Sequence, residues 1–120
     1  MPLALADAVA QAIENQAAGN STKSVSGTES ELLQTRLAKS PRMMLAITPV
    51  TAGVTIYLSL GEQAAALNQG IPLSPNQPFV QSANNVQEAL QTVWQGPIHV
   101  IATGAGSVAV TEQLYQENNP

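Results

Sequence analysis

Residues 54–61 read VTIYLSLG, and no other stretch of the 120-residue chain indicates a β-strand so clearly. Apolar side chains recur at every second position, which is the period of a strand that buries one face. The side chains that we expect to point inward are Val54, Ile56, Leu58 and Leu60, with polar or amphipathic side chains between them. This stretch therefore predicts a strand in a half-buried sheet.

The preceding segment, RMMLAITPV at residues 42–50, carries Met43, Leu45 and Ile47 on one face. A proline and a glycine interrupt the apolar run between the two segments, and such residues mark turns. We therefore predict that residues 42–50 and 54–61 pair as an antiparallel hairpin.

Further short apolar segments follow, separated by turns rich in Gly and Pro. Residues 71–73 and 79–81 are expected to be brief edge strands, where proline is tolerated. Residues 96–104 and 107–114 are expected to close the fold as a hairpin around Gly104, because their apolar side chains recur at period two. Those apolar positions are Ile98, Val100, Val108 and Val110.

Two other segments give weaker signals. Leu32, Leu33 and Leu37 fit either a first strand or a short helical turn. Asn85 followed by Glu88 resembles a capping box, which favours a short helix that carries Val86, Leu90 and Val93.

Strands of this length, with such turns and without helix–strand alternation, are typical of a small antiparallel β-sandwich or barrel. We assign this mainly β domain to residues 31–115 and predict a disordered tail at residues 116–120. Residues 20–30 are polar and rich in Ser, Thr and Gly, so we predict a flexible linker there. Residues 1–19 are predicted to form an N-terminal α-helical arm.

The helical arm is predicted from Leu5, Val9 and Ile13, which recur every four residues. Such a stripe fits either the arm's own β-domain or another subunit. Isolated helices of this length are marginal in water, and the polar linker contains little that would hold the arm to its own domain. We therefore predict that Leu5, Val9 and Ile13 bind a partner chain.

The charge content of the chain argues against nucleic acids and anionic membranes as partners. The chain has four Lys and Arg residues, eight Asp and Glu residues and a net charge of -4. Binding to nucleic acid or to an anionic membrane needs a cluster of basic side chains, which this chain lacks. No apolar run approaches the roughly 20 residues of a transmembrane helix. We therefore expect neither a nucleic-acid partner nor a membrane partner.

Candidate groups for chemistry are sparse. His99 is the only histidine, and it falls one position away from the inward register of its segment, so we expect it to face outward. The chain has no cysteine, and a lone imidazole without a carboxylate cluster is a poor zinc site. Asp7, the only aspartate, belongs to the predicted arm, so a Ser-His-Asp triad is not expected.

The glutamates that could take part in catalysis, and Arg42, are interpreted as solvated. The glutamates that could form a carboxylate pair are Glu62, Glu88, Glu112 and Glu117, and no aromatic platform for sugars accompanies them. Arg42 fits either a contact with a neighbouring chain or solvation, and solvation is the expectation. We therefore predict no enzymatic activity, no catalytic residue, no cofactor and no metal. The alternative is a small ligand-binding or enzymatic barrel that uses His99 and a glutamate.

Five pieces of the sequence, taken in order, resemble a pattern common in virion proteins of tailed bacteriophages. In this pattern a strand follows an Arg, and a V-x-I-Y-L strand comes next. The motif N-x-G-I-P-L then leads into a P-G/N turn, and G-P-I-x-x-I-A precedes a final V-x-V-x-E strand. The matching positions are Arg42 and residues 54–58, 68–73, 75–76, 96–102 and 108–112. Residues 82–93 depart from the pattern as an insert.

The resemblance implies a cement protein, which decorates and stabilises the exterior of a bacteriophage capsid. The implied partners are the major capsid protein and further copies of the chain, as a homodimer or homotrimer. The implied location is the capsid surface, after synthesis in the cytoplasm of the bacterial host. The alternative is an adaptor or adhesin module of a tail or head fibre. The family carries no catalytic residues, so the resemblance assigns none to this chain.

Overall fold

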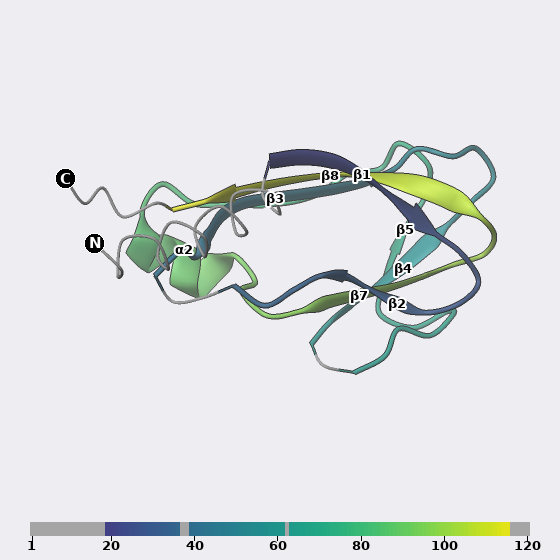
Figure 1. Ribbon diagram of the computed structural model, residues 1–120, viewed down its shortest axis with the longest axis horizontal. Coiled ribbons are helices and arrows are strands. Elements are labelled where there is room, and N and C mark those ends of the chain that lie inside the picture. Colours follow the sequence, from purple (N-terminus) through teal and green to yellow (C-terminus); the bar gives the residue numbers. More distant parts are fainter. Residues whose placement is uncertain (1–18, 37–38, 62, 116–120) are drawn as a thin grey trace, which may run out of the picture.

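Strands alternate along the chain with turns and one short helix (Figure 1). The computed structural model describes residues 19–36, 39–61 and 63–115. The elements are β1 (Gly19–Val25), β2 (Ser30–Leu33), β3 (Arg42–Pro49), β4 (Ile56–Leu60), β5 (Ile71–Leu73), β6 (Phe79–Ser82), α2 (Val86–Thr92), β7 (Ile98–Ala102) and β8 (Gly106–Leu114). No helix of these residues is long and apolar enough to cross a bilayer.

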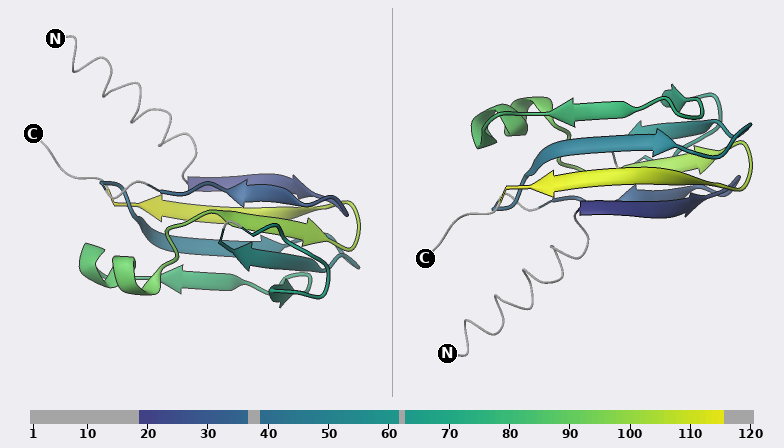
Figure 2. Two further views of the ribbon diagram at one scale, coloured as in Figure 1. Left: turned by 90° about the horizontal axis from the view of Figure 1, so that it is seen from below. Right: turned by 90° about the horizontal axis from the view of Figure 1, so that it is seen from above.

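The strands form two four-stranded sheets that pack face to face. Sheet A has the order β1-β8-β3-β6, and sheet B has the order β2-β7-β4-β5. All pairings in both sheets are antiparallel. The two views in Figure 2 look onto the two sheets from opposite sides. The predicted class, a mainly β antiparallel fold, is confirmed, and of the two expected forms the chain adopts the sandwich.

Both predicted hairpins are wrong, because the strands concerned lie in different sheets. Strand β3 pairs with β8 and β6 in sheet A, whereas β4 pairs with β7 and β5 in sheet B. In the same way, β7 belongs to sheet B and β8 to sheet A. The alternation of apolar residues identifies the buried face of a strand, but it does not identify the neighbour. Both layers of a sandwich bury one face in the same interior, so a turn between layers leaves the same sequence pattern as a hairpin.

The predicted linker at residues 20–30 is wrong over most of its length. Residues 19–25 form β1, whose register with β8 runs from Gly19 opposite Glu112 to Val25 opposite Gly106. The backbone supplies the hydrogen bonds of a ladder, and β1 is an exposed border strand, so its side chains can be polar. The prediction of a helical arm lies outside the described residues, except that Gly19, its expected last residue, is the first residue of β1. The predicted tail at residues 116–120 also lies outside them.

The interior of the sandwich is aliphatic. Both sheets supply fully buried side chains, and these include Leu45, Ile47, Ile56, Leu58, Ile98, Val100 and Val108. Of the predicted inward positions in residues 54–61, Ile56 and Leu58 are buried, while Val54 and Leu60 are partly buried against the core. The predicted brief edge strands at residues 71–73 and 79–81 are confirmed as β5 and β6.

The predicted short helix is also confirmed. In α2 the side chain of Asn85 accepts a hydrogen bond of 2.8 Å from the backbone N–H of Glu88, which satisfies an otherwise free donor of the first turn. The helix buries Ala89 and leaves Leu90 exposed.

Replacing Ile56 tests the position of the core. Ile56 is fully buried, so Ile56→Ala should lower the free energy of unfolding by about 2–4 kcal/mol, through lost burial and a residual cavity. The matched control is Ile101→Ala on the adjacent strand β7, where the side chain lies on the outer face and is half-buried. Urea denaturation of both variants should show the larger loss for Ile56→Ala, and equal losses would contradict this register.

Candidate functional site

Three charged side chains lie inside the sandwich at the end where the chain crosses twice between the sheets. Arg36 lies on the crossing from β2 to β3, Arg42 begins β3, and Glu112 lies near the end of β8. Their exposed fractions are 6%, 0% and 1%. The second crossing, from α2 to β7, supplies Gln95 and its neighbours to the same place.

The carboxylate of Glu112 binds both guanidinium groups. Nη2 of Arg36 donates to Oε1 of Glu112 at 2.5 Å, and Nε of Arg36 donates to Oε2 at 2.9 Å, so this contact is bidentate. Nε of Arg42 donates to the same Oε2 at 2.6 Å. Such paired, charge-assisted hydrogen bonds are among the strongest in proteins.

Backbone carbonyl oxygens accept the hydrogen bonds of Arg42 that Glu112 does not. The remaining donors of Arg42 reach the carbonyl oxygens of Trp94 at 2.7 Å, Gly96 at 3.0 Å and Gln34 at 2.5 Å. The side chain of Gln95 accepts from the backbone N–H of Arg42 at 2.6 Å and donates to the carbonyl oxygen of Arg42 at 2.9 Å. No buried polar side-chain atom in the described part of the chain lacks a hydrogen-bond partner. The cluster therefore ties both crossings to sheet A.

Burial and ion pairing act on the pKa values in opposite directions. Burial alone would raise the pKa of Glu112, but the hydrogen bonds and charges of Arg36 and Arg42 outweigh it and hold this pKa below its ordinary value of 4.5. Burial lowers the pKa of Arg42, and the charge of Arg36 adds to this effect, whereas Glu112 opposes it. Arginine still keeps its charge, because its ordinary pKa is so high.

The interpretation of Arg42 and Glu112 as solvated charges is wrong. One signal in the sequence locates Glu112. Val108 and Val110 point inward at period two, and the same period places Glu112 on the inward face. A carboxylate there requires a buried cation, because an unpaired charge in the interior is very costly. No comparable signal identifies Arg36.

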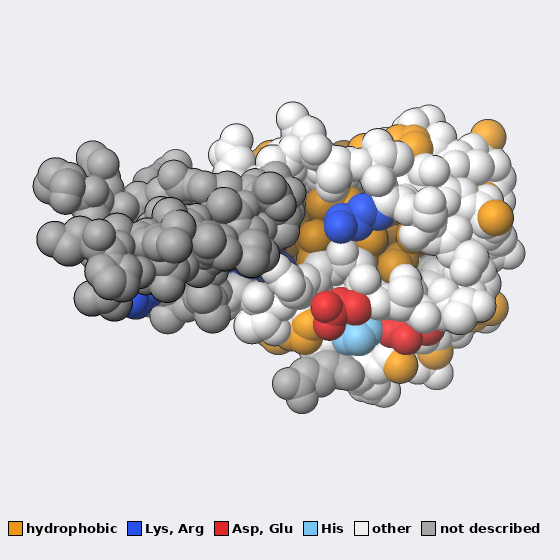
Figure 3. All heavy atoms as spheres, viewed as in Figure 1, with side chains coloured by type: hydrophobic (Ala, Val, Ile, Leu, Met, Phe, Trp, Pro, Cys, Tyr) orange, Lys and Arg blue, Asp and Glu red, His pale blue; other side chains and the backbone are white. Residues whose placement is uncertain are grey.

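His99 faces outward, as predicted, and it has a partner that the sequence did not reveal. Its Nδ1 lies 2.5 Å from Oε1 of Glu29, and Glu31 is its cross-strand neighbour on β2. Figure 3 shows the histidine between acidic side chains. The backbone N–H of Ala65 donates to the same Glu29 oxygen at 3.3 Å. In the described residues, no group of three or more His, Cys, Asp or Glu side chains is placed to hold a metal ion.

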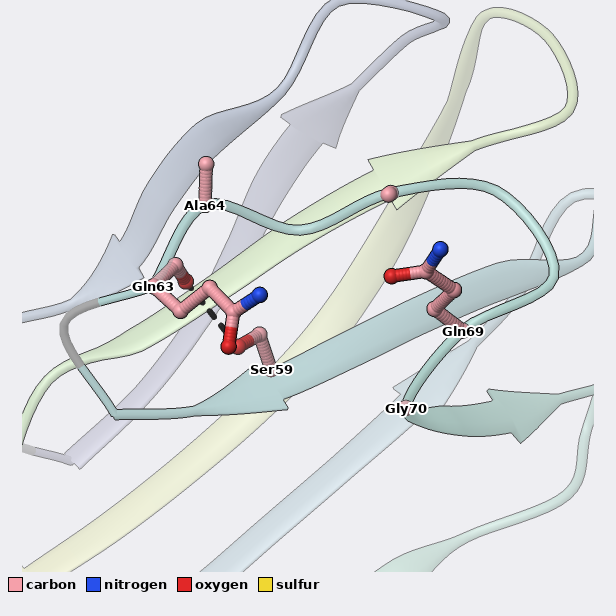
Figure 4. Close-up of a pocket in the computed structure, with 6 residues that line it drawn as sticks. Ser59, Gln63, Ala64, Gln69 and Gly70 are labelled. Atoms are coloured by element: carbon pink, nitrogen blue, oxygen red, sulfur yellow. Dashed lines mark hydrogen bonds between the residues drawn. The ribbon is translucent and has the colours of Figure 1, made fainter.

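A hollow of about 110 Å³ lies over sheet B, lined by the end of β4 and the loop before β5 (Figure 4). Ser59 Oγ donates to the carbonyl oxygen of Gln63 at 2.9 Å and fixes one side of this loop. Gly70 closes the other side, where a Cβ atom would lie 2.2 Å from the carbonyl oxygen of Leu58. Pockets for small-molecule ligands are usually about 300–1,000 Å³. The hollow has room for water but is small for an organic ligand.

The outer face of sheet A is the most distinctive surface. The register places twelve side chains on it, and not one of them is charged. They are Asn20, Thr22, Ser24, Met44, Ala46, Thr48, Val80, Ser82, Ser107, Ala109, Thr111 and Gln113. We call this set the uncharged face. In the right view of Figure 2 no described segment crosses in front of it.

Sheet B, unlike sheet A, has an outer face that carries charged side chains and is crossed by a loop. Its outer face carries His99 and Glu31, and the loop at residues 63–70 crosses it. Tyr57 Oη anchors this loop by donating to Oδ1 of Asn68 at 3.1 Å. Of the two outer faces in the described residues, the uncharged face is therefore the one with neither a charged side chain nor a loop across it (Figure 2). The predicted partner-binding residues Leu5, Val9 and Ile13 lie outside the described residues, so that part of the prediction stays a prediction.

Comparison with family models, with curated proteins and with solved structures found no match to this chain.

Removing the charge of Glu112 should destabilise the fold strongly. Glu112→Gln leaves two buried guanidinium groups without a counter-charge, and breaking a buried ion pair in this way costs about 3–5 kcal/mol. Guanidinium chloride would screen the charges, so the free energy of unfolding should be measured in urea. The control is Glu31→Gln, which removes an exposed carboxylate and should change stability little. A loss for Glu112→Gln as small as that of the control would contradict this role.

The same cluster predicts a dependence of stability on pH. The pKa of Glu112 is lower in the folded protein than in the unfolded chain, so the unfolded chain takes up a proton first as the pH falls. The contribution of Glu112 is therefore complete above the ordinary value of 4.5 and is lost as the pH falls through the folded pKa. Unfolding curves recorded from neutral to acidic pH should fall more steeply for the wild type than for Glu112→Gln. Parallel curves would show that Glu112 does not supply this component.

Proposed function

We propose that this chain is a non-enzymatic structural module, and that the uncharged face is its contact surface on a larger assembly. The assembly that we propose is the exterior of a tailed-bacteriophage capsid, where the chain acts as a cement protein. The observation that carries this proposal is the uncharged face itself, supported by the resemblance described above.

The chemistry of this face favours a protein partner. A contact over it would strip water from hydroxyl, amide and small apolar groups but from no ion, and the centres of protein interfaces are likewise depleted in charged residues. The rows Asn20–Thr111–Ala46–Val80 and Thr22–Ala109–Thr48 are built mainly from small side chains. Small side chains allow the backbone of a partner to approach closely. The hydroxyl groups of Thr22, Thr48 and Thr111 can form hydrogen bonds with that partner.

The buried ion cluster favours an uncharged face of fixed shape. The cluster of Arg36, Arg42 and Glu112 joins β3 and β8, the two central strands of sheet A, to both crossings. A preorganised surface loses little conformational entropy on binding, so that more of the contact energy appears as affinity. A shell protein repeated over many sites gains further from multivalent attachment.

The uncharged face can be tested by introducing one charge. Ala109 lies in central strand β8 between Thr22 and Thr48, so Ala109→Lys would place an ammonium group in the middle of the contact. We expect Ala109→Lys to lower the amount of protein on purified phage particles at least tenfold, as measured by quantitative mass spectrometry of particles from the producing culture. The added charge would have to be desolvated in the contact, which is why binding should fail.

Two control variants separate binding from folding. Ala109→Ser keeps the face uncharged and should bind as the wild type does. Gln69→Lys adds the same charge on the exposed loop over sheet B and should also bind normally. The capsid proposal predicts wild-type protein in numbers comparable with the capsid subunits. Wild-type protein in a few copies would indicate a tail or fibre position, and its absence from particles, or equal binding of all variants, would overturn the proposal.

A further inference from the structure

The two sheets have four border strands, and three of them are protected against pairing with another chain. An exposed border strand offers free N–H and C=O groups, and proteins commonly block it with proline, with a charged side chain, with irregular backbone or by keeping it short. Strand β5 is three residues long with Pro72 at its centre. Strand β6 has four residues and follows Pro78. Strand β2 has four residues, and its register shifts between Glu31 and Leu33.

Strand β1 has no proline and no irregular backbone and is not short, and its one charged side chain, Lys23, is half-buried and faces inward. It spans seven residues without proline, and its register with β8 is unbroken over its whole length. Its residues from Gly19 to Thr22, and Ser24, are exposed. In the right view of Figure 2, β1 is the purple strand that forms one border of sheet A. Of the border strands in the described residues, β1 is therefore the one with the longest and least interrupted backbone edge.

The hydrogen-bond pattern identifies which groups of β1 are free. The N–H of Val50 donates to the carbonyl oxygen of Ser107, so every second residue of β8 from Ser107 onward bonds towards β3. The alternate residues of β8, which include Val108 and Val110, must then bond towards β1. Their partners in β1 are Lys23 and Ser21. The N–H and C=O groups of Asn20, Thr22 and Ser24 consequently point away from the sheet.

We propose that β1 pairs with β1 of a second copy of this chain, antiparallel and about a two-fold axis at Thr22. In this register Thr22 lies opposite Thr22 of the second copy, and Asn20 lies opposite Ser24. All the outward N–H and C=O groups of both strands then find partners. The outward backbone groups of β1 in one copy are therefore complementary to those of β1 in the second copy.

The registers with the two-fold axis shifted by one residue, to Lys23 or to Ser21, are less favourable than the register with the axis at Thr22. Lys23 is the one charged residue in β1, and its side chain is half-buried on the inward face. An axis at Lys23 would place two lysines directly opposite each other, which is destabilising. With the axis at Thr22, each Lys23 faces Ser21 of the other copy. An axis at Ser21 would leave Ser24 without a partner inside β1.

The pairing would join the two copies of sheet A into one continuous sheet. The two uncharged faces would then lie side by side and form a single surface of twice the area. This inference concerns contact between copies and does not depend on the capsid role. It can be tested on the purified protein without any particle.

Single cysteines give a direct test, because the natural chain has none. Opposed residues of a hydrogen-bonded antiparallel pair have Cα atoms about 5.5 Å apart, which lies within the range that a disulfide spans. Thr22→Cys should therefore form a disulfide-linked dimer under mild oxidation. Neither Asn20→Cys nor Ser24→Cys should link to itself, but an equal mixture of these two variants should form the linked heterodimer. Mass spectrometry and non-reducing gels measure each product.

Two further variants provide controls. Ser82→Cys places a thiol on border strand β6 and should remain unlinked at the same protein concentration. Thr22→Pro removes an outward N–H without removing a bond to β8, so it should fold but behave as a monomer in analytical ultracentrifugation, where the wild type is expected to be a dimer.

Some outcomes would overturn the inference. A wild-type monomer at every concentration would exclude the dimer, as would linkage of Thr22→Cys no faster than Ser82→Cys. Linkage of Thr22→Cys no faster than Ser82→Cys would mean that the border of β1 contacts another partner or solvent. Linkage of Asn20→Cys or Ser24→Cys to itself would exclude the register. Loss of the dimer would leave the test of particle binding unaffected, so that the two proposals fail separately.

Discussion

The ion pairing of Glu112 with Arg36 and Arg42 is the constraint on which the rest of the structure depends. The chain has only four Lys and Arg residues, and it places two of them in the interior. Arg36 lies on the crossing from β2 to β3, Arg42 is the first residue of β3, and Gln95 binds Arg42 from the other crossing. A hydrophobic cluster could fill the same volume, but directional bonds fix one relative position of the sheets. The relative position of β3 and β8, the central strands of sheet A, is held by this arrangement.

Local patterns in the sequence predicted the features that depend on residues close together in the chain. The alternation at residues 54–61 identified the inward side chains of β4, and the Asn85–Glu88 pair identified the start of α2. The neighbour of each strand was not predictable in this way, because a turn between layers and a hairpin use the same turn residues. Strand β1 was missed since its polar composition matches that of a linker, and its bonds to β8 join positions distant in the sequence.

The uncharged face was also difficult to predict, because it too depends on which strands are neighbours. Its twelve residues come from four strands, and each strand contributes only two to four of them. Along the sequence they appear as ordinary outward positions between buried ones. Their common property, the lack of charge, emerges only when the order β1-β8-β3-β6 brings them together. In the buried cluster, by contrast, the inward position of Glu112 could have been read from the period of Val108 and Val110.

The order of strands also has a consequence for biosynthesis. Strand β1 leaves the ribosome before the other described strands, yet the strand that it pairs with, β8, is the last of them to be made. Chain closure over such a distance slows folding, since its entropy must be lost before the contacts form. During translation β1 therefore waits without its native neighbour, with both edges of its backbone open.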